Sequence, residues 1–143
     1  MKTQLDTFVV RSSQKQEMID ITLEVIEATR EAGIRDGFVG VFSQHTTAAV
    51  LVNEYQAALL FDIGGFLERI VEDGVSYRHN SPEWSDCARG NAASHLRSLL
   101  FNNSVMLPVV DGKPVLGQFQ SVIMAELDGP RERTIKLQFL GVS

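Results

Sequence analysis

Apolar and polar residues alternate at the start of the chain as they do in a β-strand. Residues 5–10, LDTFVV, predict an opening strand with one well-buried face and one mixed face. Ser13 followed by Gln16 matches a capping box and predicts that a helix begins there. Apolar residues then recur at steps of three and four over 18–32, and Gly33 supplies the stop. We therefore expect an amphipathic helix with a solvated acidic face.

The middle of the chain predicts two buried strands followed by a second helix. Asp36-Gly37 is a turn signal, and the apolar runs 38–42 and 50–52 indicate the strands. Residues 59–70 have helical periodicity, although Gly64-Gly65 lies inside them and costs about 1 kcal/mol per glycine relative to alanine. We interpret this glycine pair as a place of close packing against a neighbour.

The second half predicts a loop, a helix and three strands. Periodicity fails over 72–90, where the loop carries Tyr77, His79 and Trp84, and a third helix follows over 91–100. The strands are expected at 105–110, at 115–127 with a bend at Gly117, and at 134–140. This order of elements predicts an α+β fold with a single domain over 1–143.

Composition narrows the class of protein. The 143 residues are 44% hydrophobic and 22% charged, which is typical of one globular domain. A net charge of -5 and a pI of about 5.1 favour no interaction with nucleic acid. Apolar runs are far shorter than the ~20 residues of a membrane span, and no signal peptide is evident, so we expect a cytoplasmic protein that does not associate with membranes.

The three histidines are candidate metal ligands. His45 lies between the two buried strands, His79 in the long loop and His95 on the third helix. Three neutral imidazoles form a common Zn²⁺ set with an open fourth position. The spacings of 34 residues (45 to 79) and 16 residues (79 to 95) match no local zinc motif. Hydrogen-bonded structural histidines, or general acid–base chemistry by one of them, are the alternatives.

Charged residues near the end of the chain suggest anion binding. Arg131 and Arg133 are two residues apart on a predicted strand, so both side chains leave one face and suit phosphate or carboxylate. Arg97 is a third candidate. Solvated charges on an edge strand are the alternative for the pair. Glu126 ends an apolar strand and needs a partner, either Arg131, a metal-bound water or a substrate donor, or else a structural salt bridge.

Two further positions have alternative interpretations. Asn53 is either the N-cap of the second helix or a member of the site. Cys87 is the single cysteine, and we interpret it as a free thiol, with a fourth metal ligand as the alternative.

Five ordered blocks of sequence resemble the YjbQ-like family, also called the secondary thiamine-phosphate synthase family. They are HTTAA with Asn53-Glu54, Tyr77-Arg78-His79, residues 91–98, residues 116–120 and residues 126–131. The resemblance covers essentially the whole chain. It implies an α+β domain with a mixed or antiparallel sheet, a homotrimer, and a histidine-lined metal site near the subunit boundary formed by His45, His79 and His95. The metal would be a divalent ion, Zn²⁺ first and Mg²⁺ as the alternative.

The resemblance also implies an activity. It would join a pyrimidine diphosphate to a thiazole phosphate with release of pyrophosphate, as a secondary activity on a small phosphorylated metabolite. Glu126 and Gln120 would be catalytic. The residues expected to bind substrate are Arg131, Arg133, Arg97, Thr46, Thr47 and Asn53. The alternatives are a trimeric small-molecule-binding module with a structural metal, and a metal-dependent phosphoester hydrolase.

Two departures from the family pattern concern the pocket wall. Phe119-Gln120-Ser121 stands where the family has tryptophan, glutamine and glycine, and Phe101-Asn102-Asn103 stands where it has glycine and a small residue. The resemblance therefore predicts the fold of the chain but does not identify its substrate.

Overall fold

The computed structural model describes all 143 residues as three α-helices, one 3₁₀ turn and eight strands. The helices are α1 (Thr22–Ala32), α2 (Ala57–Ile70) and α3 (Ala92–Ser98), and the 3₁₀ turn is η1 (Arg78–Asn80). The strands are β1 (Lys2–Arg11), β2 (Glu17–Asp20), β3 (Asp36–Ser43), β4 (Ala48–Asn53), β5 (Ser104–Val110), β6 (Lys113–Pro114), β7 (Ser121–Glu126) and β8 (Glu132–Val142). The predicted α+β class is confirmed.

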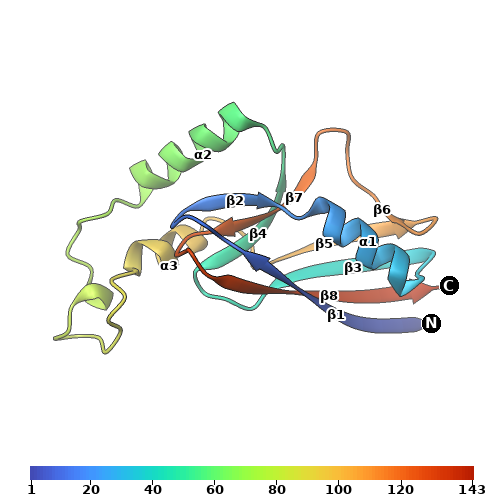
Figure 1. The fold of residues 1–143 in the computed structure, drawn as a ribbon, viewed down its shortest axis with the longest axis horizontal. Helices are drawn as coiled ribbons and strands as arrows, with labels where there is room; N and C mark the ends of the chain where they lie inside the picture. The colour runs from blue at the N-terminus through green and yellow to red at the C-terminus, as the bar shows by residue number, and fades with distance from the viewer.

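The strands form two sheets, which we call sheet A and sheet B. Sheet A has the order β1-β8-β3-β5-β6, and sheet B has the order β2-β7-β4. Every strand pair is antiparallel, so of the mixed or antiparallel sheet that we expected, the antiparallel form is the one observed. Figure 1 shows β1 and β8 on one side of the molecule, α2 and α3 on the other, and sheet B between them.

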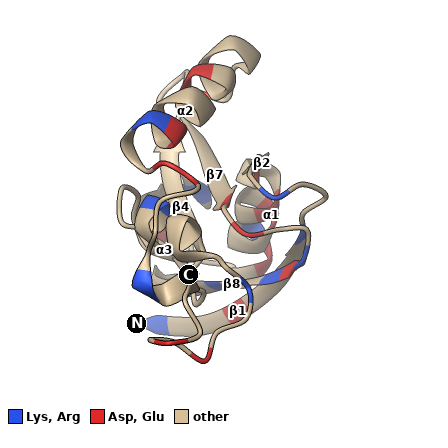
Figure 2. Cartoon of the chain, turned by 90° about the vertical axis from the view of Figure 1, so that its left-hand side faces the viewer, with Lys and Arg blue, Asp and Glu red and all other residues tan.

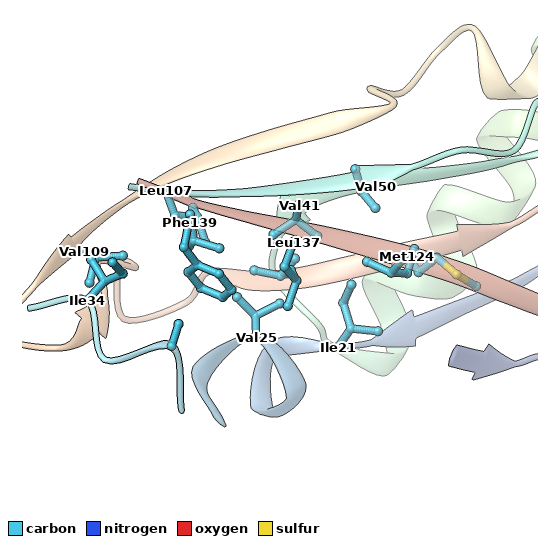
Figure 3. Packing of buried hydrophobic residues seen from close by; sticks show 14 of the residues in the cluster. Ile21, Val25, Ile34, Val41, Val50, Leu107, Val109, Met124, Leu137 and Phe139 are labelled. Carbon is cyan, nitrogen blue, oxygen red and sulfur yellow. The ribbon is translucent and has the colours of Figure 1, made fainter. Parts of the chain in front are cut away.

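The main core lies between the inner face of sheet A and a layer made by α1 and sheet B. Val25 of α1, Leu137 and Phe139 of β8, Val41 of β3 and Met124 of β7 are all fully buried there. Figure 3 shows Val25 of α1 and Ile21, the residue before α1, pointing toward the sheet. The three- and four-residue spacing of the apolar side chains of α1 places them on this face, and the glutamates between them are exposed.

A smaller core lies on the other face of sheet B, beneath α2. Leu67 is the one fully buried residue of α2 and packs with Leu51, Ile123 and Leu127. The rest of α2 stands clear of the body, as Figure 1 shows. Because only one position of this helix is buried by its own chain, most of its apolar surface remains uncovered.

The predicted start of the first helix is wrong. Ser13 does not cap a helix, because its N–H donates to the carboxylate of Glu17 (2.8 Å) in a tight turn before β2. The helix begins at Thr22, whose N–H donates to Asp20 Oδ1 (3.0 Å). Strand pairing of residues 17–20 with β7 replaces the helical hydrogen bonds that the capping box predicted.

The long strand predicted over 115–127 is also wrong. Residues 113–114 pair with β5 as β6, and β7 begins only at Ser121. Between them, the N–H of Gly117 donates to Gln120 Oε1 (2.7 Å), which closes a turn.

Charged residues of both signs are scattered over the end of the molecule that carries α3, with no continuous band of Lys and Arg (Figure 2). None of the helices is both long enough and apolar enough to cross a membrane.

Candidate functional site

His45 lies in the connection between β3 and β4, and its position is set by hydrogen bonds on both sides. Its backbone N–H donates to Ser43 Oγ (3.3 Å), and that hydroxyl donates to the carbonyl of Ala48 (3.0 Å). The ring nitrogen Nε2 accepts from the backbone N–H of Thr134 in β8 (2.9 Å). The short connection and the strand next to it therefore hold the imidazole in one place.

His45 and His95 line one pocket of about 570 Å³. Thr46 lines the same pocket and is exposed. The opposite wall comes from α3 and the segment after it: Leu96, Ser98, Leu99, Phe101, Asn102 and Asn103. The departure of Phe101-Asn102-Asn103 from the family pattern thus falls directly on the pocket wall.

His79 approaches His95 but faces a different hollow. The two rings are in an edge-to-face contact with centroids 4.9 Å apart and an interplanar angle of 87°. His79 comes from η1 and is exposed beside Pro82 and Trp84, in a hollow of about 780 Å³. The ring of Trp84 there packs under the guanidinium of Arg78, 4.6 Å from the ring centroid.

The predicted three-histidine metal site does not form within the chain. No group of three or more His, Cys, Asp or Glu side chains is arranged so that it could hold an ion. His45 uses Nε2 to accept from Thr134, and His79 meets His95 edge to face instead of converging on a common point. Because the three imidazoles do not form one ligand group within the chain, we correct the assignment of His45, His79 and His95 as one ligand set.

Both pocket histidines have a pKa below the ordinary value. For His45, burial is the main cause, and the positive charges of Arg133 and Arg131 add to it against the opposing charge of Glu126. For His95, burial again lowers the pKa and the neighbouring His79 lowers it further. Two neutral imidazoles therefore face the pocket at neutral pH.

Glu126 and Arg133 form a buried ion pair instead of facing a ligand. Glu126 is 0% exposed and Arg133 is 1% exposed. Arg133 Nε donates to both carboxylate oxygens (2.9 and 3.0 Å), and Ser12 Oγ donates to Glu126 Oε1 (2.6 Å). Burial opposes ionisation of Glu126, but the hydrogen bonds from Arg133 and Ser12 outweigh it and hold the pKa below its ordinary value. A structural salt bridge was the alternative for Glu126, and it is the one observed, with Arg133 as the partner.

Arg131 and Arg133 are not on one strand as predicted. β8 begins at Glu132, so Arg131 precedes the strand, and its side chain remains 31% exposed. Its guanidinium lies 3.7 Å from Asp128 Oδ2. Of the two arginines, only Arg131 is accessible to an anion.

Asp128 organises the second buried cluster, and sequence reasoning missed it. Its carboxylate accepts from Arg89 Nε and Asn91 Nδ2, both at 2.9 Å. Burial opposes ionisation, yet the hydrogen bonds from Arg89 and Asn91 keep the pKa of Asp128 below its ordinary value. We interpreted Asp128-Gly129-Pro130 only as a turn. Asp128 follows Glu126 by two residues at the end of a buried strand, and this second acid could have indicated the role.

The other predicted residues lie away from the pocket opening. Arg97 is buried and donates to the carbonyl of Val71 (2.7 Å), which fastens α3 to the end of α2. Asn53 does not cap α2, because Gln56 does so by accepting from the N–H of Leu59 (2.8 Å). Gln120 is exposed in the β6–β7 connection, and Cys87 lies 3.7 Å from Asn91 Oδ1.

Comparison with known proteins gives consistent matches along nearly the whole chain. Residues 6–142 match the family model described as UPF0047 protein YjbQ-like. A UPF0047 protein of Methanothermobacter thermautotrophicus is 42% identical over 92% of this chain and 88% of its own length. A crystal structure of a YbjQ-like protein of unknown function from Sulfolobus solfataricus P2 has a TM-score of 0.89 and 33% identity, covering 98% of each chain. A hypothetical protein from Aeropyrum pernix K1 has a TM-score of 0.87 at 35% identity, covering 96% of this chain and 98% of its own.

These matches correct the predicted activity. The relatives are named as UPF0047 or YbjQ-like proteins, one of them explicitly of unknown function, and none is named as a thiamine-phosphate synthase. Together with the absence of a metal-ligand cluster, this overturns the prediction of a metal-binding transferase. The structural-metal module and the metal-dependent hydrolase depended on the same cluster and fail with it.

Proposed function

The chain belongs to the UPF0047 family of YjbQ-like proteins, and on that premise we propose that its pocket between His45 and His95 binds a small anionic metabolite, either phosphorylated or carboxylated. The observation that carries this proposal is the shared pocket itself. Two neutral imidazoles and the exposed Thr46 face one open hollow of about 570 Å³.

The charges around the pocket favour an anion. The charges of Arg133 and Arg131 lower the pKa of His45, and the charge of Glu126 opposes them. Arg133 is neutralised by Glu126, whereas Arg131 remains partly exposed and only loosely paired with Asp128. A guanidinium and imidazole N–H groups are suitable donors for phosphate or carboxylate oxygens.

Isothermal titration with inorganic phosphate and with succinate tests the proposal. His95→Gln and Arg131→Gln are each expected to weaken binding about tenfold or more, because each removes a hydrogen bond to a charged group. His79→Gln and Arg30→Gln are the matched controls, since His79 faces the other hollow and Arg30 is exposed on α1. Equal affinity in all four variants, or no binding of either probe to the wild type, would refute the pocket.

We also propose that the chain self-associates as a homotrimer through the outer face of sheet A. That face has no covering layer and carries Leu5, Phe38, Met106 and Leu140, which are 59%, 49%, 62% and 44% exposed. The register places Phe38 directly beside Leu140 across β3 and β8, so these side chains form a continuous patch. Exposed apolar patches of this kind are typical of protein–protein interfaces.

Light scattering after size exclusion tests this proposal. The wild type is expected at three times the chain mass of 15.8 kDa. Phe38→Lys is expected to shift the mass to that of the single chain, because it places a charge at the centre of the patch. Leu23→Lys is the control, since Leu23 is 72% exposed on α1 and lies off this face. A monomeric wild type would contradict the assignment.

A further inference from the structure

His45 takes the place of a strand residue at the point where a β-ladder ends. β3 stops at Ser43, which pairs with Ile135 of β8. The next N–H along β8 in that direction belongs to Thr134, and His45 Nε2 accepts from it at 2.9 Å. The imidazole therefore replaces a backbone carbonyl as the acceptor of this strand, which makes its orientation part of the sheet.

The residue next to Thr134 holds the other side of the same connection. Arg133 Nη2 donates to the backbone carbonyl of Thr47 (3.0 Å) and to its hydroxyl (2.9 Å). Glu126 accepts from Nε and Nη2 of the same guanidinium and is itself held by Ser12. Consecutive residues of β8 thus contact His45 and the residue two positions after it.

We infer that the buried pair Glu126 and Arg133 are positioning residues, which hold the connection that carries His45 and so keep His45 as a fixed hydrogen-bond donor of the pocket. A neutral imidazole carries one N–H. Since Nε2 of His45 accepts from Thr134, the proton resides on Nδ1.

The consequence for a ligand rests on the pocket proposed above, but the state of His45 does not. A fixed Nδ1–H can bind an anionic oxygen, whereas it cannot abstract a proton without loss of the contact to Thr134. In the proposed pocket, His45 would therefore bind the anion as a donor and would not act as a base.

Nitrogen-15 NMR of the ligand-free full chain, labelled at histidine and measured at pH 8, reports which ring nitrogen carries the proton. His79→Gln and His95→Gln assign the signals by elimination. In the wild type, His45 is expected to be wholly in the Nδ1–H tautomer. A His45 ring in the Nε2–H tautomer, or averaged between both, would overturn the inference. Because no ligand is present, failure of phosphate binding would refute the pocket without changing this result.

Replacement of the ion pair separates positioning from simple structural support. In the Glu126→Leu/Arg133→Met double variant, checked for a cooperative melt, His45 is expected to populate both tautomers and phosphate affinity to fall about tenfold. The single variant Arg133→Lys keeps a donor near Thr47. It is expected to retain part of the preference of His45 for the Nδ1–H tautomer. A folded double variant that keeps a pure Nδ1–H tautomer would refute the role of the pair. If the double variant does not fold, the tautomer of His45 is measured in Thr47→Val, which removes only the hydroxyl that accepts from Arg133. A mixture of tautomers would support the role of the pair, and a pure Nδ1–H tautomer would refute it.

Discussion

Replacement of Glu126 by glutamine is the sharpest test of the buried network. The change preserves the shape of the side chain but removes the negative charge opposite Arg133. Arg133 is 1% exposed, so water cannot solvate the guanidinium that is left without a counter-ion. The amide of glutamine would also direct N–H groups toward Arg133 Nε, which donates to both carboxylate oxygens in the wild type.

The magnitude follows from the burial of both partners. Removal of one member of a buried ion pair costs about 3–5 kcal/mol, because an uncompensated charge remains. Domains of this size have a free energy of unfolding of about 5–15 kcal/mol. We therefore expect Glu126→Gln to remove a large share of the stability. The Glu126→Leu/Arg133→Met double variant should recover most of the loss, since it removes both charges together.

Urea denaturation followed by circular dichroism measures the effect, at one protein concentration because self-association would shift the midpoint. The matched control is Glu132→Gln at the start of β8, where Glu132 pairs with Arg11 and both side chains are more than half exposed. That surface pair should contribute less than about 1 kcal/mol. An equal, small loss in Glu126→Gln and Glu132→Gln would refute the argument that the buried pair is essential for stability.

Four further outcomes follow from the structure. The pKa values of Glu126 and Asp128 are lowered on folding, so their contribution to the free energy of unfolding is complete above about pH 4–5 and is lost as the pH falls through and below the ordinary carboxyl range. Measurement of the unfolding free energy at a series of acid pH values should show this loss, and the loss should be smaller in Glu126→Gln. The pKa of His95 is lowered, so phosphate affinity should rise as the pH falls below about 6.5 and the ring gains charge, and a flat profile would argue against His95 as a pocket residue. Gly141→Ala should destabilise strongly, because its Cβ would lie 2.3 Å from the Asp36 carbonyl, whereas Gly64→Ala in α2 meets only Gln16 at 3.6 Å and should stabilise the monomer by about 1 kcal/mol in thermal melts. EDTA should leave the melting temperature unchanged, because no metal-ligand cluster holds the chain together, and a clear drop would show that a bound ion stabilises it.

Local sequence patterns predicted a helix or strand correctly where the residues of that element alone favour its structure. The apolar runs at 38–42 and 50–52 are strands, and the helical period at 59–70 and 91–100 gives α2 and α3. The first helix was placed too early because Ser13 and Gln16 satisfy a capping pattern. The preference of residues 17–20 for β7, more than a hundred residues away, overrode it.

The histidines show the same division within the site. Their residue type suggested chemistry, and the structure does bring His45 and His95 to one pocket. A histidine can serve as a metal ligand, a base or a structural acceptor, and its sequence neighbours do not distinguish these roles. The N–H of Thr134, 89 residues away, is what assigns Nε2 of His45 as an acceptor.

The sequence by itself determined the α+β class, the amphipathic helices, the buried strands and the family, because each follows from residue periodicity or from ordered motifs. Only the tertiary structure decided that Glu126 pairs with Arg133, that Asp128 gathers Arg89 and Asn91, and that the histidines do not form a metal site. These contacts join residues from different strands and loops. Their energies depend on burial and on exact distances, which no local pattern of residues specifies.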